Sequence, residues 1–145
     1  MIAYLDASVL IPTLVEETDS ADVDAYILSG TERWLISEFA AAEVASGLSR
    51  MVRMGRLDSA GAIRRLDDFE TWRAADAVSV DFQPSDARLA YTYVRRFELA
   101  LRAPDALHLA MARRLGATMV TLDRRMARAA TELGVAVDLL GPAPH

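Results

Sequence analysis

The sequence contains neither cysteine nor lysine, and each absence excludes a class of chemistry. Without cysteine there can be no disulfide, no thiolate nucleophile and no cysteine-ligated zinc, which fits a cytoplasmic protein. All 16 basic residues are arginine. Lysine Schiff bases and the lysine of a phosphate-binding P-loop are therefore excluded as well.

Long apolar segments and an excess of positive charge are also missing. Asp6 interrupts the first apolar run too early for a signal peptide, and every later run meets a charge before the roughly 20 residues that a membrane-spanning helix needs. The net charge of −5 argues against a protein that holds nucleic acid by a broad basic surface. We expect a soluble protein with no membrane contact, made of one domain over residues 1–145 with a loose tail at 142–145.

Short apolar runs alternate with segments of helical periodicity along the whole chain. This alternation predicts an α/β fold with a central parallel sheet of about five strands joined by right-handed crossovers. The expected strands are residues 2–5, 34–36, 78–80, 118–122 and 135–139. Pro12 is expected to shorten or kink the first helix, and one helix is expected from Pro84 to about Leu99.

Asp6 and Asp123 share the same local pattern, an apolar strand followed by an aspartate where a helix begins. Because the carboxyl ends of parallel strands lie at one edge of the sheet, neighbouring strands would bring these two carboxylates together at the ligand crevice. The alternative for each residue is a helix N-cap, which stabilises a helix by about 1 kcal/mol. Two families that also begin with a strand-terminal aspartate, response-regulator receivers and haloacid-dehalogenase phosphatases, normally use a lysine and are disfavoured.

Glu43 lies in the middle of a helix predicted over residues 38–54, beside its apolar stripe. Gly47, one turn later, costs about 1 kcal/mol relative to alanine, which suggests that something approaches the helix closely there. Small residues around a half-buried carboxylate would leave room for a metal ion and a phosphate. A solvated glutamate is the alternative.

Asp105 follows Pro104 in the first turn of another predicted helix, where a negative charge is favourable whatever its function. With a simple connection to the next strand, we expect Asp105 nearer the amino edge of the sheet, so that the helix start would have to lean over the crevice. If Asp105 joins Asp6, Glu43 and Asp123, their mutual repulsion requires a cation or raised pKa values. Carboxylate oxygens favour Mg²⁺ or Mn²⁺ over zinc.

Four segments in this order resemble the PIN domain family, and specifically the VapC toxins of bacterial toxin–antitoxin pairs. They are Leu5-Asp6-Ala7-Ser8-Val9-Leu10, Ser37 with Glu43, Pro104-Asp105-Ala106-Leu107-His108-Leu109-Ala110, and Val120-Thr121-Leu122-Asp123. The resemblance covers essentially the whole chain. It implies a PIN-like, Rossmann-like three-layer sandwich and an Mg²⁺- or Mn²⁺-dependent endoribonuclease.

The same resemblance assigns roles to single residues. It implies that Asp6, Glu43, Asp105 and Asp123 hold the metal, directly or through water, and orient the attacking water. Ser8 and Thr121 would support the site by hydrogen bonds, and Arg102 is a candidate for binding substrate phosphate. Family members usually form homodimers and are inhibited by a small VapB-like antitoxin. The rival interpretation is a non-catalytic PIN-like module that uses the acidic pocket to recognise a partner.

For several other polar residues, a purely structural role explains the sequence at least as well as a functional role. His108 lies one turn after Asp105, but helix packing is the favoured role, and with only His145 besides it a ribonuclease built on two histidines is disfavoured. Arginine pairs such as Arg124-Arg125 could bind RNA phosphates, although such pairs are mostly solvated helix faces.

Overall fold

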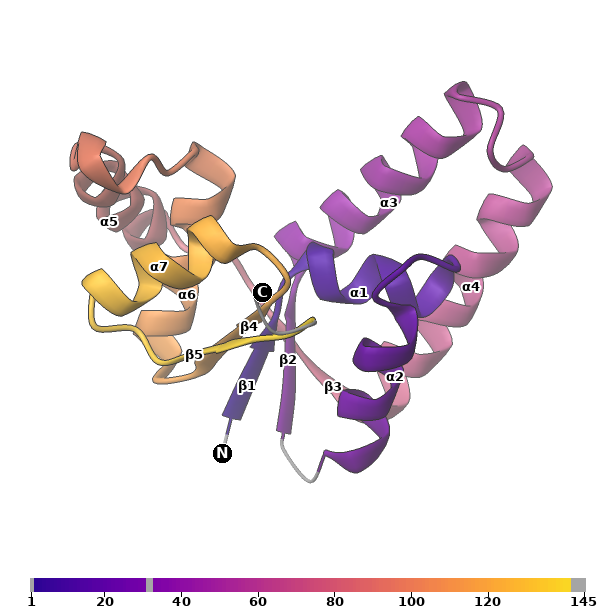
Figure 1. Ribbon diagram of the computed structural model, residues 1–145, viewed down its shortest axis with the longest axis horizontal. Helices are drawn as coiled ribbons and strands as arrows, with labels where there is room; N and C mark the ends of the chain where they lie inside the picture. Colours follow the sequence, from indigo (N-terminus) through magenta and orange to yellow (C-terminus); the bar gives the residue numbers. More distant parts are fainter. Residues whose placement is uncertain (1, 31–32, 142–145) are drawn as a thin grey trace.

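The structure is a computed structural model that describes residues 2–30 and 33–141. Its centre is a sheet of five parallel strands in the order β3-β2-β1-β4-β5, and β1 lies in the middle (Figure 1). The predicted parallel α/β sheet is therefore confirmed. The strands are β1 (Ile2–Leu5), β2 (Arg33–Ser37), β3 (Ala77–Val80), β4 (Thr118–Thr121) and β5 (Val137–Leu139).

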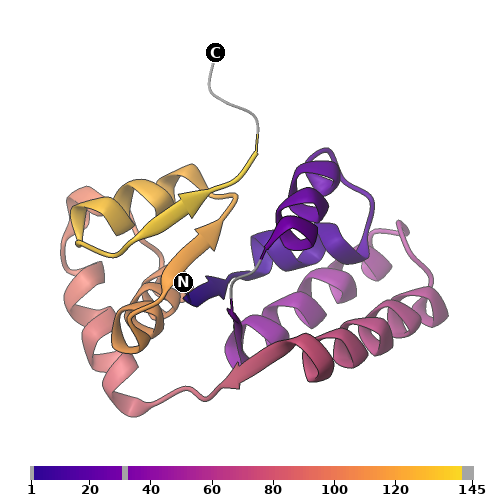
Figure 2. The same cartoon turned by 90° about the horizontal axis from the view of Figure 1, so that it is seen from below.

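Helices cover both faces of this sheet and complete a three-layer sandwich. Figures 1 and 2 show the first four helices on one side and the last three on the other. One side carries α1 (Ala7–Leu14), α2 (Ser20–Ser29), α3 (Glu38–Arg53) and α4 (Ser59–Asp76). The other side carries α5 (Pro84–Val94), the 3₁₀ turn η1 (Phe97–Leu99), α6 (Ala103–Leu115) and α7 (Arg124–Glu132).

Side chains of β1 alternate between two separate cores, as expected for a strand buried on both faces. Ala3 and Leu5 pack with the α1–α4 layer, whereas Tyr4 packs with the α5–α7 layer. All three side chains are fully buried. Tyr4 therefore carries a phenol hydroxyl into an apolar layer, where it needs a hydrogen-bond partner.

The helix expected from Pro84 to about Leu99 ends early, at Val94. The chain then makes the η1 turn and passes through Ala100 with a left-handed φ of 53°. Leu99 and Leu101 on either side of this turn are both buried. A continuous helix could not return the chain so that α6 packs against α5, and this tertiary requirement outweighs helical periodicity.

No helix within the described residues is long and apolar enough to cross a membrane. The predicted loose tail at 142–145 lies outside those residues.

Gly47 is approached closely, as its position in α3 suggested, but by a neighbouring helix. A Cβ atom at this position would lie 2.7 Å from the Cδ1 atom of Ile11 on α1. The space at Gly47 is thus used for packing α1 against α3, and the expectation that it leaves room for an ion and a phosphate is wrong at this residue.

Substitutions at Gly47 should separate the effect of helix propensity from the effect of packing against Ile11. We expect Gly47→Ala to change the free energy of unfolding by less than about 1 kcal/mol, because the gain in helix propensity offsets a small displacement of the flexible Ile11 end. Gly47→Leu should destabilise the fold by about 2 kcal/mol through overpacking. Urea unfolding of the two variants measures this difference, and equal stabilities would show that the α1–α3 contact is loose.

Candidate active site

Asp6 stands at the carboxyl end of the central strand, where β1 turns into α1. Its backbone N–H donates to the carbonyl of Val120 in β4, so the two strand ends stay paired up to this point. Its side chain accepts the N–H of Val9 at 3.3 Å and caps α1. Asp6 is only 3% exposed. Both interpretations of this residue, helix cap and site carboxylate, are compatible with its position.

Ser8 and Thr121 fix the orientation of the Asp6 carboxylate. The Ser8 hydroxyl donates to Oδ1 of Asp6 at 2.6 Å, and the Thr121 hydroxyl donates to Oδ2 at 2.7 Å. The same hydroxyl oxygens accept the backbone N–H groups of Leu122 and Asp123, each at 3.0 Å. These bonds tie Asp6 to the end of β4 and hold both strand ends in one arrangement.

The Asp6 carboxyl has a raised pKa because burial disfavours its charged form. The hydrogen bonds from Ser8 and Thr121, and the nearby His108, lower the pKa without compensating for burial. Within the described residues, none of the salt bridges involves Asp6. A buried carboxylate without a cationic partner is an electrostatic cost that a bound cation would remove.

Asp105 and Asp123 lie close enough to influence each other's charge. Burial raises the pKa of the half-buried Asp105, and the negative charge of Asp123 raises it further. Asp123 caps α7 and accepts the N–H of Arg125 at 2.9 Å. Since Asp123 follows β4, Asp105 also lies at the carboxyl edge of the sheet. The expected position near the amino edge is wrong, because a helix that precedes a parallel strand runs antiparallel to it and begins at the carboxyl edge.

Glu43 reaches the same region from α3. Its Oε1 atom makes a short hydrogen bond with Nε2 of His108 on α6. The Glu43 side chain is 31% exposed, whereas the His108 side chain is 3% exposed. Glu43 is therefore not the freely solvated glutamate of the alternative interpretation. His108 also lowers the pKa values of Asp6 and Asp105, so it lies among three of the four carboxylates.

A buried hydrogen-bond network continues from His108 into the sheet. Its Nδ1 atom lies 2.7 Å from the Tyr4 hydroxyl, which is also 2.8 Å from Oγ of Ser37. Ser37 in turn accepts the N–H of Ala40 and caps α3. The sequence favoured simple packing for His108 and assigned no role to Tyr4. The signal for Tyr4 was a phenol in a strand expected to be buried on both faces.

Arg102 precedes α6 as its N-cap residue and is exposed. Its positive charge slightly lowers the pKa of Asp105, so it lies near the acidic residues. None of the salt bridges within the described residues includes Arg102.

The site thus offers carboxylate and hydroxyl oxygens with one imidazole, a donor set that suits Mg²⁺ or Mn²⁺. The raised pKa values of Asp6 and Asp105 show that negative charge is unfavourable here without a counterion. Within residues 2–30 and 33–141, however, no three acidic, histidine or cysteine side chains are grouped closely enough to ligate one ion together. The chemistry fits the cation, whereas the full set of direct ligands is not preassembled.

Solved structures with this fold are numerous. The chain is similar to VapC20 from Mycobacterium tuberculosis, described as a toxin that cleaves the sarcin–ricin loop, with a TM-score of 0.72 and 16% identity over 88% of this chain and 94% of that chain. It is similar to FitAcB from Neisseria gonorrhoeae, with a TM-score of 0.71 and 20% identity over 94% and 96%. It is also similar to VapBC2 from Rickettsia felis, bound to a fragment of promoter DNA, with a TM-score of 0.70 and 16% identity over 96% of this chain and 98% of that chain.

No curated protein sequence matches this chain. The family comparison is decisive, because residues 3–132 match the PIN domain. The matched range includes the resemblance segments noted in the sequence and all four carboxylates. The chain belongs to the PIN domain family.

Proposed function

We propose that the protein is a VapC-type toxin, an endoribonuclease that depends on Mg²⁺ or Mn²⁺ and is neutralised by a small VapB-like antitoxin. The observation that carries this proposal is the gathering of carboxylates from separate segments at the carboxyl edge of the sheet. Asp6, Asp105 and Glu43 all lie within electrostatic or hydrogen-bonding range of His108, and the charge of Asp123 raises the pKa of Asp105.

In this proposal the four carboxylates hold the ion, some of them directly and the others through water. A bound Mg²⁺ or Mn²⁺ would neutralise charge on the RNA phosphate and lower the pKa of a water molecule. The protein orients the reacting groups: Ser8 and Thr121 fix both oxygens of Asp6, so its carboxylate cannot turn away. Water-bridged ligation is consistent with side chains that are not grouped tightly enough for three direct ligands within the described residues.

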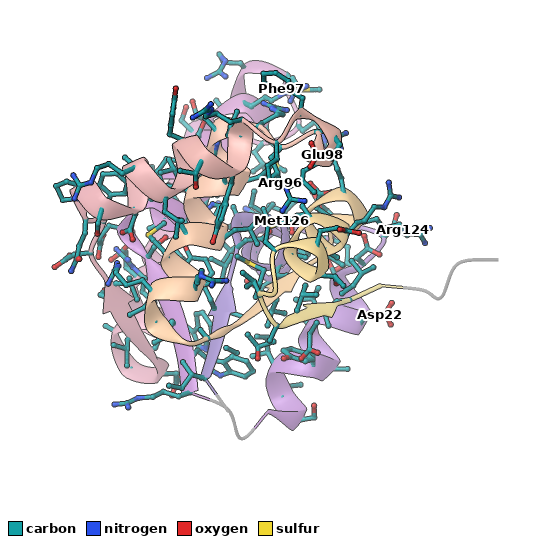
Figure 3. The ribbon with its side chains drawn as sticks, turned by 90° about the vertical axis from the view of Figure 1, so that its left-hand side faces the viewer. Asp22, Arg96, Phe97, Glu98, Arg124 and Met126 are labelled. Atoms are coloured by element: carbon teal, nitrogen blue, oxygen red, sulfur yellow. The ribbon has the colours of Figure 1, made fainter. Side chains whose placement is uncertain are left out.

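Exposed arginines at two helix starts are the candidates for contact with RNA phosphates. Arg102 is the N-cap residue of α6 and Arg124 is the first residue of α7, and both are exposed. The η1 turn packs against α7, and Figure 3 shows Arg96 and Glu98 of this turn region on the same side of the molecule as Arg124. Arg96 is paired with Glu98 at 2.9 Å, whereas none of the described ion pairs includes Arg102 or Arg124.

An antitoxin partner is supported by the similar structures. The structure from Rickettsia felis is a VapBC complex bound to DNA. We therefore propose a VapB-like partner for this chain, together with the homodimer that the sequence resemblance implies. We also propose the cytoplasmic location that the absence of cysteine favours.

The test is RNA cleavage by the purified protein with and without a divalent ion. We expect cleavage of a structured RNA in Mg²⁺ or Mn²⁺, loss of cleavage in EDTA, and recovery when Mn²⁺ is returned in excess. Addition of the cognate antitoxin should stop the reaction. Cleavage that survives EDTA would contradict the metal mechanism, and a protein that binds its antitoxin but cleaves no RNA would favour the non-catalytic binding module.

A further inference from the structure

We propose that His108 is a positioning residue that holds the Glu43 carboxylate in its working orientation and is itself anchored by Tyr4. This inference rests on the proposed ribonuclease function. His108 and Glu43 are 65 residues apart and come from α6 and α3, so their hydrogen bond joins two of the elements that carry site carboxylates.

The direction of this hydrogen bond follows from the chemistry of the two groups. An ionised carboxylate can only accept, so Nε2 of His108 carries the proton and donates to Glu43. The other ring nitrogen, Nδ1, lies 2.7 Å from the Tyr4 hydroxyl, so a second hydrogen bond ties the ring to the central strand. One ring thus connects the central strand to Glu43, with a hydrogen bond at each of its nitrogens.

The imidazole ring is held rigidly. The Tyr4 ring packs edge-on against it with a centroid distance of 5.6 Å, and the Phe39 ring lies at 5.2 Å. Tyr4 is fully buried and also hydrogen-bonds Ser37, the cap of α3. The ring therefore cannot turn without disturbing the strand that ends at Asp6 and the helix that carries Glu43.

Glu43, by contrast, has little else to fix it. Within residues 2–30 and 33–141 the only hydrogen bond of its side chain is the one through Oε1 to His108, which leaves Oε2 without a protein partner. A long side chain that is 31% exposed would otherwise sample several rotamers. With Oε1 held, Oε2 is the oxygen left to face a cation or its water. A misplacement of about 1 Å at such a group can reduce the rate about 100-fold.

Three substitutions of His108 separate positioning from packing. In His108→Gln the amide nitrogen lies where Nε2 was and can donate to Glu43. In His108→Asn the amide nitrogen lies where Nδ1 was and does not reach Glu43. His108→Leu fills the space but has no donor. We expect His108→Leu and His108→Asn to lower kcat about 100-fold with KM changed less than about threefold, and His108→Gln to recover kcat to within about tenfold of wild type. If the ring only packs, Leu should be tolerated best, which would overturn the proposal.

Tyr4→Phe provides a second route that keeps the packing and removes only the hydroxyl. We expect it to lower kcat about tenfold while His108 stays in place. This variant, with the contrast between Gln and Asn, keeps the proposal testable if His108→Leu does not fold, as judged by circular dichroism. Wild-type kcat in Tyr4→Phe together with equal kcat values in the Gln and Asn variants would refute it.

Mn²⁺ binding measured by calorimetry in the absence of RNA gives a readout that does not depend on cleavage. We expect His108→Leu to weaken Mn²⁺ binding about tenfold and His108→Gln to restore it. If Mn²⁺ binding by wild type and the variants follows this pattern but wild type cleaves no RNA, the ribonuclease proposal fails while the positioning of Glu43 stands. If the variants bind Mn²⁺ as wild type does and kcat is also unchanged, His108 does not position Glu43.

Discussion

Replacement of Asp6 by asparagine is expected to reduce RNA cleavage about 1000-fold or more in saturating Mg²⁺. Asp6→Asn keeps the size of the side chain and an oxygen that can accept from Ser8 and Val9, and its amide nitrogen can donate to the Thr121 hydroxyl oxygen, so the local fold should persist. It removes the buried negative charge that we propose attracts the cation. Single-turnover cleavage assays at several Mg²⁺ concentrations measure the effect, and rescue by high Mg²⁺ would show that only ion affinity was lost.

The same substitution should make the metal-free protein more stable, by about 1 kcal/mol at neutral pH. The reason is the raised pKa of Asp6, caused chiefly by burial. Between the ordinary aspartate pKa and this higher folded value the native state binds more protons than the unfolded state, so stability falls as pH rises through that window. An asparagine at this position causes no such loss of stability with rising pH, because it never carries the charge.

Thermal unfolding in EDTA at neutral pH tests this expectation. The Tm of Asp6→Asn should lie above that of wild type, and added Mg²⁺ should raise the Tm of wild type only. Asp68→Asn is a matched control, because Asp68 is exposed on α4 and should affect neither cleavage nor Tm. A lower Tm for metal-free Asp6→Asn would mean that its hydrogen bonds outweigh the cost of its buried charge.

The placement of Asp6 and Asp123 could be predicted because it depends only on strand direction. Both follow apolar runs of parallel strands, and the pairing of Leu5 with Val120 brings the two strand ends together. The position of Asp105 was also within reach, since the helix before β4 must run antiparallel to it. A simple connection therefore places Asp105 at the carboxyl edge of the sheet and not at the expected amino edge.

The contacts of Glu43 and Gly47 could not be predicted in the same way. They depend on which side chains of α6 and α1 face α3, and helical periodicity leaves the rotation and height of one helix against another undefined. His108 therefore looked like a packing residue, and Gly47 like a place for a ligand instead of Ile11. Local sequence patterns predict the helices and strands and the edge of the sheet at which the carboxylates lie. The contact partners of Glu43 and Gly47 depend on long-range packing between helices.

The largest expected loss of stability comes from a site away from the carboxylates. Asp86 on α5 is 2% exposed and accepts two hydrogen bonds from Arg114 on α6, from Nε at 2.8 Å and from Nη2 at 3.0 Å. It also accepts the N–H of Gln83 at 2.9 Å at the start of α5. We expect Asp86→Ala to lower the free energy of unfolding by about 3 kcal/mol, because it removes a bidentate partner and a helix cap together.

The pH dependence of this loss distinguishes an ion pair from simple packing. Burial alone raises the pKa of Asp86, but the bonds from Arg114 and Gln83 outweigh it, so the net pKa lies below the ordinary value. The contribution of this ionised carboxylate is therefore complete above the unfolded pKa of about 4 and is lost as pH falls through the lower folded value. Urea unfolding of wild type and Asp86→Ala should differ most near neutral pH and converge in acid.

Two further variants decide whether the loss belongs to the Asp86–Arg114 pair. Asp81→Ala alters an exposed neighbour whose side chain makes no described hydrogen bond and should leave stability within about 0.5 kcal/mol of wild type. The double variant Asp86→Ala with Arg114→Met should be more stable than Asp86→Ala alone, because it no longer leaves a partly buried guanidinium without its carboxylate. If the double variant is as unstable as the sum of the single changes, the two side chains are not coupled, and α5 and α6 are held together by their apolar contacts.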